Sequence, residues 1–379
     1  MRRVRLGDVC RIVSGSTPKS GNPDFWGGAI PWVTPAELDD ESHWVFRTDR
    51  YLTETGFDSA SLRMMPIGTV LLSTRAPIGK TAIAGVEMCC NQGFKNLVCG
   101  DEIDCEYLYR FLKSNTSTLQ ALGRGATFKE LSKREVERFE IPLPPLERQR
   151  ECTSRLDAID NEIARARTLS KTLDELVKSR FVEMFGDADG EHRRLEDCCV
   201  KVVGGKTPSM KHPEYYGGDI PFIKSGDVKS DVVSSGALWL SNEAMEKASV
   251  KLVPAGSVLV VVRSALLKRK VSTSIASCKV AINQDIRAFS PKPEFTSSYL
   301  LWSIRSHEQE LLEHVRSVNT SGIDMRQLYD LSIRVEPIDK QQEFAAFVRQ
   351  VDKLKFETQQ AIDKLQMLYD SLAQEYFGS

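Results

Sequence analysis

The sequence contains no apolar run long enough to cross a membrane. A spanning helix needs ~20 predominantly apolar residues, whereas polar side chains interrupt every hydrophobic stretch of this 379-residue chain. The two arginines near its start have no apolar segment behind them, so we expect no signal peptide. With 41% hydrophobic and 27% charged residues, the composition predicts a cytoplasmic globular protein of roughly two to three domains.

Cysteine patterns typical of a metal site or a disulfide framework are missing too. The nine cysteines form no C-x-x-C pair, and the five histidines lack the spacing of metal ligands. An odd cysteine count with two adjacent pairs is typical of buried thiols in a reducing cytosol. We therefore expect neither a metal site nor a disulfide.

A strong charge of one sign is also absent. The formal net charge is −1, and acidic and basic side chains nearly balance along the whole chain. Proteins that attract nucleic acid through a global field carry a clear basic excess. Any contact of this chain with nucleic acid must therefore come from local clusters of basic residues.

What the sequence does contain is a repeat. The segment "NPDFWGGAIPWV" at 22–33 recurs as "HPEYYGGDIPFI" at 212–223. One proline, the Gly-Gly pair and the Ile-Pro pair are identical, and aromatic residues replace one another at the other key positions. A Thr-Pro pair precedes each copy, at 17–18 and at 207–208.

The same offset of about 190 residues links further segments of the chain. The matched pairs are "PIGTVLLSTRA" (66–76) with "PAGSVLVVVRS" (254–264), "NQG" (91–93) with "NQD" (283–285), and "PPLERQ" (144–149) with "EPIDKQ" (336–341). So many matches in one order indicate an internal duplication. We infer two units that meet at the Gly/Asp-rich segment "GDADGEH" (186–192).

Each unit is predicted to be an α+β globule followed by a long helix. Val- and Leu-rich runs between Gly and Pro predict buried strands, and the segments 106–115 and 297–315 have helical spacing of apolar residues. No Gly or Pro occurs between 147 and 185. The predicted divisions are a globule at 1–146, a helix at 147–186, a globule at 187–338 and a helix at 339–379.

Each helix of about 40 residues would be ~60 Å long, which exceeds what one globule can cover. Apolar residues recur along both helices with the three-four spacing of a packing seam. We expect the helices to pack antiparallel on each other, related by an internal pseudo-twofold; two independent dimerisation arms are the alternative. The residues predicted to form the helix seam or to bind a partner are Leu156, Ile159, Ile163, Leu173, Phe347, Val351, Leu354, Ile362, Leu365 and Leu372.

Two segments look catalytic at first sight. The tetrapeptide "NPDF" at 22–25 is one residue away from Asn-Pro-Pro-Phe, the signature of enzymes that methylate amino groups of flipped DNA bases. It lacks the second proline, its copy begins with His212, and no Gly-rich turn for S-adenosylmethionine precedes it. We interpret the segment as a tight turn, in which proline fixes φ and the Gly-Gly pair permits unusual dihedral angles.

The second segment is "GKT" at 79–81, which ends like a phosphate-binding Walker A loop. That loop requires a glycine five residues before Gly79, where this chain has Thr74. The other copy contains no such tripeptide. The sequence therefore does not predict nucleotide hydrolysis.

The combined features resemble the specificity subunit of type I restriction-modification systems. The resemblance rests on three motifs that occur twice: "G-x-T-P…W/Y-G-G-x-I-P-W/F", "P-x-G-[TS]-V-L" followed by Arg and "N-Q", and the "P-P-L-x-x-Q"-like opening of each long helix. Together they cover essentially the whole chain.

The resemblance implies a non-catalytic subunit. Each globule would be a target recognition domain that reads one half of a bipartite, asymmetric target in double-stranded DNA. The helices would set the spacing and dock two methyltransferase subunits, which restriction subunits join in a full assembly. No cofactor is expected on this chain, because S-adenosylmethionine, Mg²⁺ and ATP would be bound by the partners. The alternative is a duplicated protein-binding scaffold without DNA readout.

On this interpretation, basic and amide side chains near the strand ends become candidate DNA contacts, because Arg and Lys bind phosphate or guanine and Asn and Gln bind adenine. The candidates are Lys19, Arg75, Lys80, Asn91, Gln92, Lys95, Arg124, Lys129, Lys206, Lys224, Arg263, Lys268, Arg269, Lys270, Asn283, Gln284 and Arg326. An Asn-Gln pair can equally cap a turn, and the segments 123–131 and 319–328 can equally be plain loops.

Overall fold

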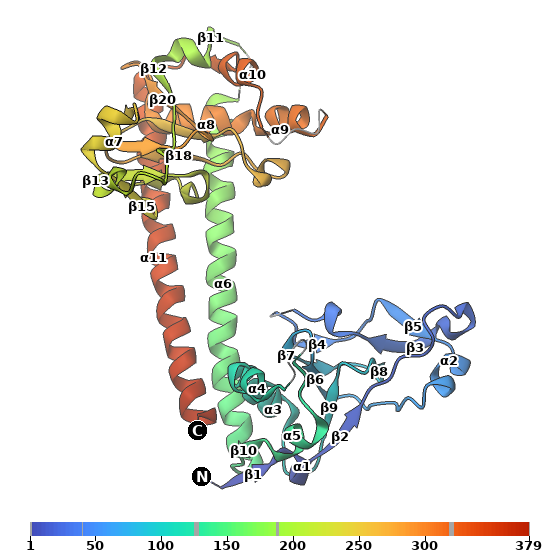
Figure 1. Ribbon diagram of the computed structural model, residues 1–379. Coiled ribbons are helices and arrows are strands. Elements are labelled where there is room, and N and C mark those ends of the chain that lie inside the picture. Colours follow the sequence, from blue (N-terminus) through green and yellow to red (C-terminus); the bar gives the residue numbers. More distant parts are fainter. Residues whose placement is uncertain (1, 40, 125–128, 187–188, 318–321, 379) are drawn as a thin grey trace. The chain divides into compact units, whose positions relative to one another are not determined.

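The computed structural model of the protein describes residues 2–39, 41–124, 129–186, 189–317 and 322–378. The chain divides into two compact units (Figure 1). Unit 1 consists of Met1–Arg167 and Gln359–Ser379, and unit 2 consists of Thr168–Thr358. Each unit therefore contains one globule, the first half of one long helix and the second half of the other. The predicted hinge at 186–192 lies partly outside the described residues.

Two helices of 40 residues each dominate the chain, α6 (Leu146–Phe185) and α11 (Ile338–Phe377). Both begin directly after a proline, which is compatible with the first turn of a helix because its missing N–H would have no partner there. Neither contains a Gly or Pro that would interrupt the hydrogen-bond ladder. The two long helices predicted from the sequence are confirmed.

A five-stranded sheet forms the main layer of each globule. In unit 1 the strand order is β2-β9-β6-β7-β4, with β2 Cys10–Ser14, β9 Lys95–Cys99, β6 Val70–Thr74, β7 Ile78–Ala84 and β4 Trp44–Val45. In unit 2 it is β12-β20-β17-β18-β14, with β12 Cys199–Gly204, β20 Ile286–Pro291, β17 Val258–Val261, β18 Thr273–Ala276 and β14 Val232–Val233. Both sheets are antiparallel except for the last pair, which is parallel. The duplication thus extends to the sheet topology.

Smaller sheets complete each globule. Unit 1 has the order β5-β3-β8, with β5 Arg50–Leu52, β3 Trp26–Val33 and β8 Cys89–Cys90. Unit 2 has the order β15-β13-β19-β16, with β15 Leu238–Leu240, β13 Tyr216–Ile223, β19 Val280–Ile282 and β16 Leu252–Val253. A two-stranded ribbon precedes each long helix and pairs β1 Arg3–Arg5 with β10 Glu140–Pro142, or β11 His192–Arg194 with β21 Ser332–Arg334.

Short helices cover the sheets. Unit 1 has α1 Leu6–Val9, α2 Glu54–Ser59, α3 Cys105–Ser114, α4 Thr116–Leu122 and α5 Lys133–Arg138, and unit 2 has α7 Asn242–Lys247, α8 Ser297–Ser306, α9 Glu308–Ser317 and α10 Met325–Tyr329. Side chains of Asp104 and Thr296 accept backbone hydrogen bonds at the starts of α3 and α8. The helical spacing at 297–315 is confirmed, and the segment forms two helices, because His307 takes the C-cap position of α8 and α9 begins at Glu308.

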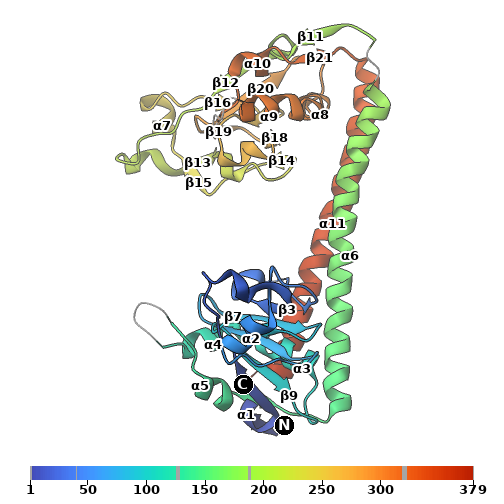
Figure 2. The same cartoon turned by 90° about the vertical axis from the view of Figure 1, so that its right-hand side faces the viewer.

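The largest core of each unit lies where a long helix ends against the short helix of the globule. In unit 1 the ring of Phe377 lies 5.2 Å from that of Tyr107, measured between centroids. In unit 2 Phe185 lies 4.9 Å from Tyr299. Each such buried ring contributes ~1.5–3 kcal/mol, so these contacts fix the helix ends to the globules. The two chain termini lie side by side in unit 1 (Figure 2), where Arg3 donates to the carbonyl of Gly378.

The long helices pack on each other within both units. In unit 1, Ile159, Ile163 and Ile362 form a buried cluster, against which Leu365 and Leu372 pack. In unit 2, Arg180 bonds Glu343 at 2.9 Å, and Lys355 bonds Asp174 at 2.6 Å. The paired residue numbers run in opposite directions, so the helices are antiparallel, as predicted.

Other predicted seam residues have different surroundings. Leu156 is buried in the core of unit 1. Leu173 and Val351 are buried in the core of unit 2, and Phe347 packs against that core. Leu354 is 50% exposed, so it is not buried in the seam, and its role as a partner-binding residue stays a prediction. Val351 and Lys355, one helical turn apart, occupy the inward side of α11 at this level, which leaves Leu354 outside.

The Gly-Gly turn of the repeat is confirmed. In unit 1, Trp26 and Ile30 both pair with Leu52, so the intervening residues bulge out of the sheet. Gly27 has φ +83°, in the left-handed region that favours glycine. A Cβ on Gly28 would lie 2.3 Å from the carbonyl oxygen of Leu52. The first glycine thus provides the dihedral angle and the second permits the close approach of β5.

The equivalent turn of unit 2 has the same two requirements. Gly217 has φ +82°. A Cβ on Gly218 would lie 2.5 Å from the carbonyl oxygen of Leu240. Because both copies keep this division of roles, the turn is a structural feature of the fold, as the sequence predicts.

Alanine substitutions should separate the two roles. Gly27→Ala is expected to cost about 1–2 kcal/mol through backbone strain alone. Gly28→Ala should cost about 3 kcal/mol, because β5 must move to admit the methyl group. Gly21→Ala is the control, because a Cβ there meets no atom within 4 Å. Chemical denaturation measures all three, and equal stabilities of the Gly27 and Gly28 variants would contradict this assignment.

Candidate DNA interface

Four segments that are distant in the sequence meet at the end of β6 in unit 1. The amide of Thr74 donates to the carbonyl of Gly93 at 2.8 Å, and that of Leu131 donates to Thr74 at 2.9 Å. The amide of Ser16 donates to the carbonyl of Cys90 at 3.0 Å. We call residues 15–17, 74–75, 91–95, 124 and 129–131 the strand-end cluster of unit 1.

Unit 2 builds the same arrangement at the end of β17. The amide of Val262 donates to Asp285 at 2.7 Å, that of Ile323 donates to Val262 at 2.9 Å, and that of Lys206 donates to Ile282 at 3.0 Å. The strand-end cluster of unit 2 comprises residues 205–207, 262–263, 283–285 and 322–323. The two clusters share their backbone hydrogen bonds and differ in side chains.

Contacts within this cluster explain the glycine and the threonine of the Gly-x-Thr-Pro motif. A Cβ on Gly15 would lie 1.9 Å from the carbonyl oxygen of Asn91, so only glycine permits this approach. The hydroxyl of Thr17 donates to the side-chain oxygen of Gln92. The motif therefore exists to hold one segment against the Asn-Gln turn.

The second copy confirms this role. A Cβ on Gly205 would lie 2.0 Å from the carbonyl oxygen of Asn283. The hydroxyl of Thr207 donates to the side-chain oxygen of Gln284 at 2.5 Å. Two motifs that the sequence shows only as separate matches are thus one structural unit, present in each globule.

Sequence comparison decides the family. The family described as "Type I restriction modification DNA specificity domain" matches residues 1–174 and 188–366. The chain belongs to this specificity family. Both matched segments contain one globule, so the family domain is present twice.

Curated relatives agree with this assignment. The MjaIX specificity subunit of Methanocaldococcus jannaschii is 30% identical over 67% of this chain and 64% of that protein. The EcoR124I/EcoR124II specificity subunit of Escherichia coli is 30% identical over 41% of this chain and 39% of that protein. The chain thus aligns with less than two thirds of the length of these relatives.

Two solved structures show the same fold. A chain from a study of assembly and conformational transition of the type I R-M system has a TM-score of 0.65 at 21% identity, over 99% of this chain and 97% of that one. The crystal structure of a type I restriction-modification S subunit from M. genitalium has a TM-score of 0.57 at 12% identity, over 100% and 96%. Their likeness extends over both globules and both long helices.

In this specificity-family chain, several predicted residues of unit 1 do come together. Arg75 follows β6 directly and is half-buried. The side chain of Asn91 accepts the amide of Gly93 at 2.8 Å, so it caps the turn. Gln92 is exposed. Lys95 lies 3.8 Å from Glu130, measured between ammonium and carboxylate.

The basic residues before α5 lie at the border of this cluster. Arg124 is exposed and its guanidinium lies 3.1 Å from the carboxylate of Glu135. The backbone amide and hydroxyl of Ser132 hold the pKa of Glu135 below its usual range, with a smaller contribution from Arg124. Lys129 is also exposed. Residues 125–128 of the predicted segment 123–131 lie outside the described residues.

Two other candidates of unit 1 lie differently. The ammonium of Lys80 donates to the carbonyls of Pro35, at 2.9 Å, and of Leu38. Lys80 therefore stabilises the globule from inside, and its placement gives no support to the prediction of a DNA contact. Lys19 is exposed, and its carbonyl accepts the indole N–H of Trp26 at 3.4 Å.

In unit 2, Lys206, Arg263 and Gln284 are exposed at the strand-end cluster. Asn283 is buried and donates to the carboxylate of Asp285 at 2.9 Å, so it supports the turn from inside. The cluster of unit 2 thus presents two basic side chains and one amide to solvent.

The remaining candidates of unit 2 lie outside its cluster. Lys224 is exposed just after β13, and Arg326 is exposed in α10. Residues 319–321 of the predicted segment 319–328 lie outside the described residues. Lys268, Arg269 and Lys270 are exposed on the loop after Arg263, which no motif connects to the repeat.

Lys270 belongs to a different environment. It lines a cavity of about 870 Å³ in unit 2, together with Asp231 and Arg305. Burial alone would raise the pKa of Asp231, but Arg305, 2.7 Å away, holds it below its usual range. This cavity contains charges of both signs and Trp302, and is distinct from the strand-end cluster.

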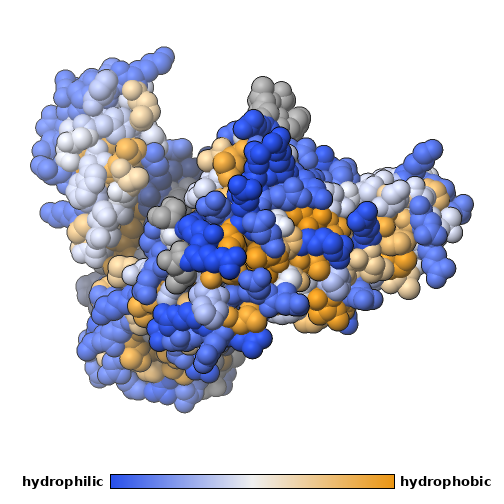
Figure 3. All heavy atoms as spheres, turned by 90° about the horizontal axis from the view of Figure 1, so that it is seen from below, coloured by the Kyte–Doolittle hydropathy of each residue, from blue (hydrophilic) through white to orange (hydrophobic). Residues whose placement is uncertain are grey.

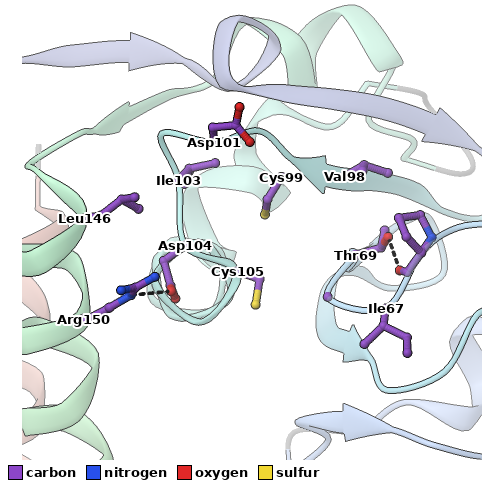
Figure 4. A pocket seen from close by; sticks show the side chains of 12 residues that line it. Ile67, Thr69, Val98, Cys99, Asp101, Ile103, Asp104, Cys105, Leu146 and Arg150 are labelled. Carbon is purple, nitrogen blue, oxygen red and sulfur yellow. Dashed lines mark hydrogen bonds and ion pairs between the residues drawn. The ribbon is translucent and has the colours of Figure 1, made fainter.

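A smaller cavity of about 290 Å³ lies in unit 1 beside the start of α6 (Figure 4). Cys99 and Cys105 point into it, and Arg150 reaches toward Asp104 at 3.6 Å. Burial raises the pKa of Cys105 to about 12, so this thiol is protonated at neutral pH and is a poor nucleophile. Among the described residues, no group of three or more His, Cys, Asp or Glu could hold a metal ion.

Two contacts near the candidate site could not be recognised in the sequence. Gln149 and Gln341 are buried and fix the start of each long helix to its globule, although the repeat contained this signal in "PPLERQ" and "EPIDKQ". Arg50 stacks on Trp26. The repeat could not indicate this contact, because Leu238 occupies the position of Arg50 in the second copy. No described helix has the length and apolarity needed to span a bilayer.

Proposed function

We propose that this chain is the DNA-specificity subunit of a type I restriction-modification complex. Each globule reads one half of a bipartite target in double-stranded DNA. The observation that carries the proposal is the strand-end cluster, which occurs once in each unit and collects exposed basic and amide side chains on a shared backbone frame. Reading and catalysis are divided, so the chain itself performs no chemistry.

The side chains suit this task. Arg124 and Lys129 in unit 1, like Lys206 and Arg263 in unit 2, are exposed and cationic. Such residues neutralise phosphates and position a protein on the duplex. Because each phosphate contact releases counterions, the logarithm of the binding constant should fall linearly with the logarithm of the salt concentration.

The differences between the clusters support an asymmetric target. Gly93 of unit 1 is replaced by Asp285 in unit 2. A shared frame with different side chains is what two reading heads of different specificity require, since backbone contacts position and side chains at base edges specify. The two half-sites therefore differ in sequence.

The long helices provide the second half of the function, which is spacing and docking. Leu176 on α6 and Leu368 on α11 are equivalent in the repeat, and 47% and 48% of their surface is exposed. Figure 3 shows patches of hydrophobic residues among hydrophilic ones on the face that is seen from below. Equivalent exposed apolar residues on both helices suit two copies of one partner, and we assign them to two methyltransferase subunits.

The cofactors belong to those partners. S-adenosylmethionine is bound by the methyltransferase subunits, and Mg²⁺ and ATP by restriction subunits where these join the complex. This chain contributes recognition and geometry, while the methyl transfer takes place on DNA that it has positioned.

Selection from random duplexes tests the proposal. The full chain, alone and together with its methyltransferase partner, is incubated with a random duplex library across a salt series. We expect enrichment of two specified blocks separated by an unspecified spacer, with affinity falling as salt rises. A protein-binding scaffold would enrich no motif, and that result would reject DNA recognition.

A further inference from the structure

One arginine of unit 1 is held in an unusual way. Arg50 begins β5, an edge strand of the small sheet. Its guanidinium carbon lies 3.4 Å from the ring centre of Trp26 and 5.4 Å from that of Trp32. The two indoles meet edge to face, with centroids 5.0 Å apart and planes at 76°. The guanidinium of Arg50 therefore lies over the face of the Trp26 indole and beside that of Trp32.

The indoles form a fixed platform. Trp32 is only 3% exposed, and its N–H donates to the carbonyl of Ser16 at 3.1 Å. The N–H of Trp26 donates to the carbonyl of Lys19 at 3.4 Å. The first bond fixes Trp32 to the Gly-x-Thr-Pro segment, whose residues 15–17 belong to the strand-end cluster, and the second fixes Trp26 to Lys19, which directly follows that segment. Arg50 thus lies beside the surface proposed to contact DNA.

The donors of this guanidinium are available. Arg50 is exposed, and within the described part of the chain its guanidinium has no hydrogen-bond or ion-pair partner. Stacking on an aromatic ring occupies the face of the group and leaves the N–H donors at its edge. A side chain ordered before binding loses less entropy on contact, which favours recognition of a planar pair of acceptors.

Unit 2 has a leucine, Leu238, at the position equivalent to Arg50. The sheet register places Arg50 opposite Trp32, and Leu238 opposite Phe222 at the same point of the repeat. Tyr216 replaces Trp26 and donates its hydroxyl to the carbonyl of Pro208 at 2.7 Å. The platform is conserved in its role of holding the loop, whereas the cation is present in one unit only.

This asymmetry decides between two roles of the arginine. A phosphate contact that positions DNA is useful to both reading heads and would fit the frame that they share. A contact present in one head only fits the readout of a base that occurs in one half-site. Because the indole covers one face of the guanidinium, the N–H donors remain at its edge. Two such donors match the O6 and N7 acceptors of guanine, which a guanidinium binds with two parallel hydrogen bonds.

We propose that Arg50, stacked on Trp26, reads a guanine in the half-site bound by unit 1. The inference rests on the proposed function, because it requires DNA at the strand-end cluster. Two N–H groups of Arg50 donate to O6 and N7 in the major groove, while Trp26 keeps the guanidinium plane in place.

Library selection with variants of the full chain, in complex with its methyltransferase partner, tests the role of Arg50. The Arg50→Leu variant introduces the residue of unit 2. It should lose the preference for one G·C pair in one half-site by about tenfold or more, and leave the other half-site unchanged. The Arg50→Lys variant keeps the charge but not the planar fork, so it should lose the same preference with an unchanged salt slope. Arg47→Leu, at another exposed arginine nearby, is the control and should change no position.

The outcomes are distinguishable. If Arg50→Leu weakens binding to all sequences equally and reduces the salt slope by about one, the residue contacts a phosphate and the proposal is wrong. If the guanine preference survives in Arg50→Leu, Arg50 has no role in readout, although the proposed function stands. A wild-type protein that enriches no split motif would overturn both.

Discussion

Replacing Gln149 by leucine is expected to lower the free energy of unfolding by about 3 kcal/mol or more. Gln149 is fully buried, and its side-chain nitrogen donates to the carbonyls of Glu102, at 2.9 Å, and Pro144, at 2.8 Å. Its oxygen accepts the amide of Asp104 at 2.9 Å. Leucine fills much of the space but removes the partner of all three backbone groups, at a cost of ~1–3 kcal/mol for each group that water cannot reach.

The repeat allows the same experiment twice in one molecule. Gln341 is also fully buried, donates to the carbonyls of Glu294 and Glu336 at 2.9 Å each, and accepts the amide of Thr296 at 2.8 Å. Gln341→Leu should therefore destabilise unit 2 by a similar amount. In both units the glutamine joins the start of a long helix to the N-terminus of α3 or α8, which couples the globule to the helix.

The neighbouring Gln342 provides the control. It is exposed, so Gln342→Leu should change the free energy of unfolding by less than about 0.5 kcal/mol. Denaturant titration measures all three variants, and hydrogen exchange at the amides of Asp104 and Thr296 locates the effect. If Gln149→Leu is as stable as Gln342→Leu, the coupling of globule and helix does not depend on these hydrogen bonds.

The long helices illustrate what local sequence determines. Their bounds follow from the absence of Gly and Pro and from the preceding prolines, all of which act within one turn of the helix. The Gly-Gly turn is equally local, because φ at Gly27 is a property of one residue. The repeat adds long-range information, since two copies that fold alike must share their sheet order.

Contacts between distant segments could not be predicted. Lys80 has the sequence environment of a surface residue, yet its ammonium bonds carbonyls more than 40 residues earlier in the chain. Leu354 fits the three-four spacing, but the inward side of α11 at that level is decided by Lys355 and its partner Asp174. The residue types of the candidate site could be predicted from the sequence. Their assembly around Thr74 could not, because it depends on hydrogen bonds between distant segments.

Arg50 shows a further limit of sequence reasoning. The repeat identified shared positions, and a residue that specifies one half-site is by its nature not shared. Its partner Trp26 was visible only as an aromatic position of the turn. The contact between them became apparent through the register of β3 and β5, which places Arg50 opposite Trp32.

Exchange of residues 1–146 for the globule of another specificity subunit should change one half-site completely and leave the other unchanged. The reason lies in how each unit is built. The core of unit 1 includes Leu156 from α6 and Phe377 from α11, so an incoming globule must repack these two residues and offer partners to Gln149. A donor that keeps aromatic residues at the positions of Tyr107 and Phe111 meets the first requirement.

Selection from the random library measures the result, and exchange of residues 187–338 is the reciprocal control. The first exchange should alter the block that Arg50→Leu also alters, because both act on unit 1. The reciprocal exchange should alter only the other block. If either exchange changed both blocks, the half-sites would not be read by separate globules, since a globule with its own core and its own strand-end cluster has no direct means of altering base contacts made by the other.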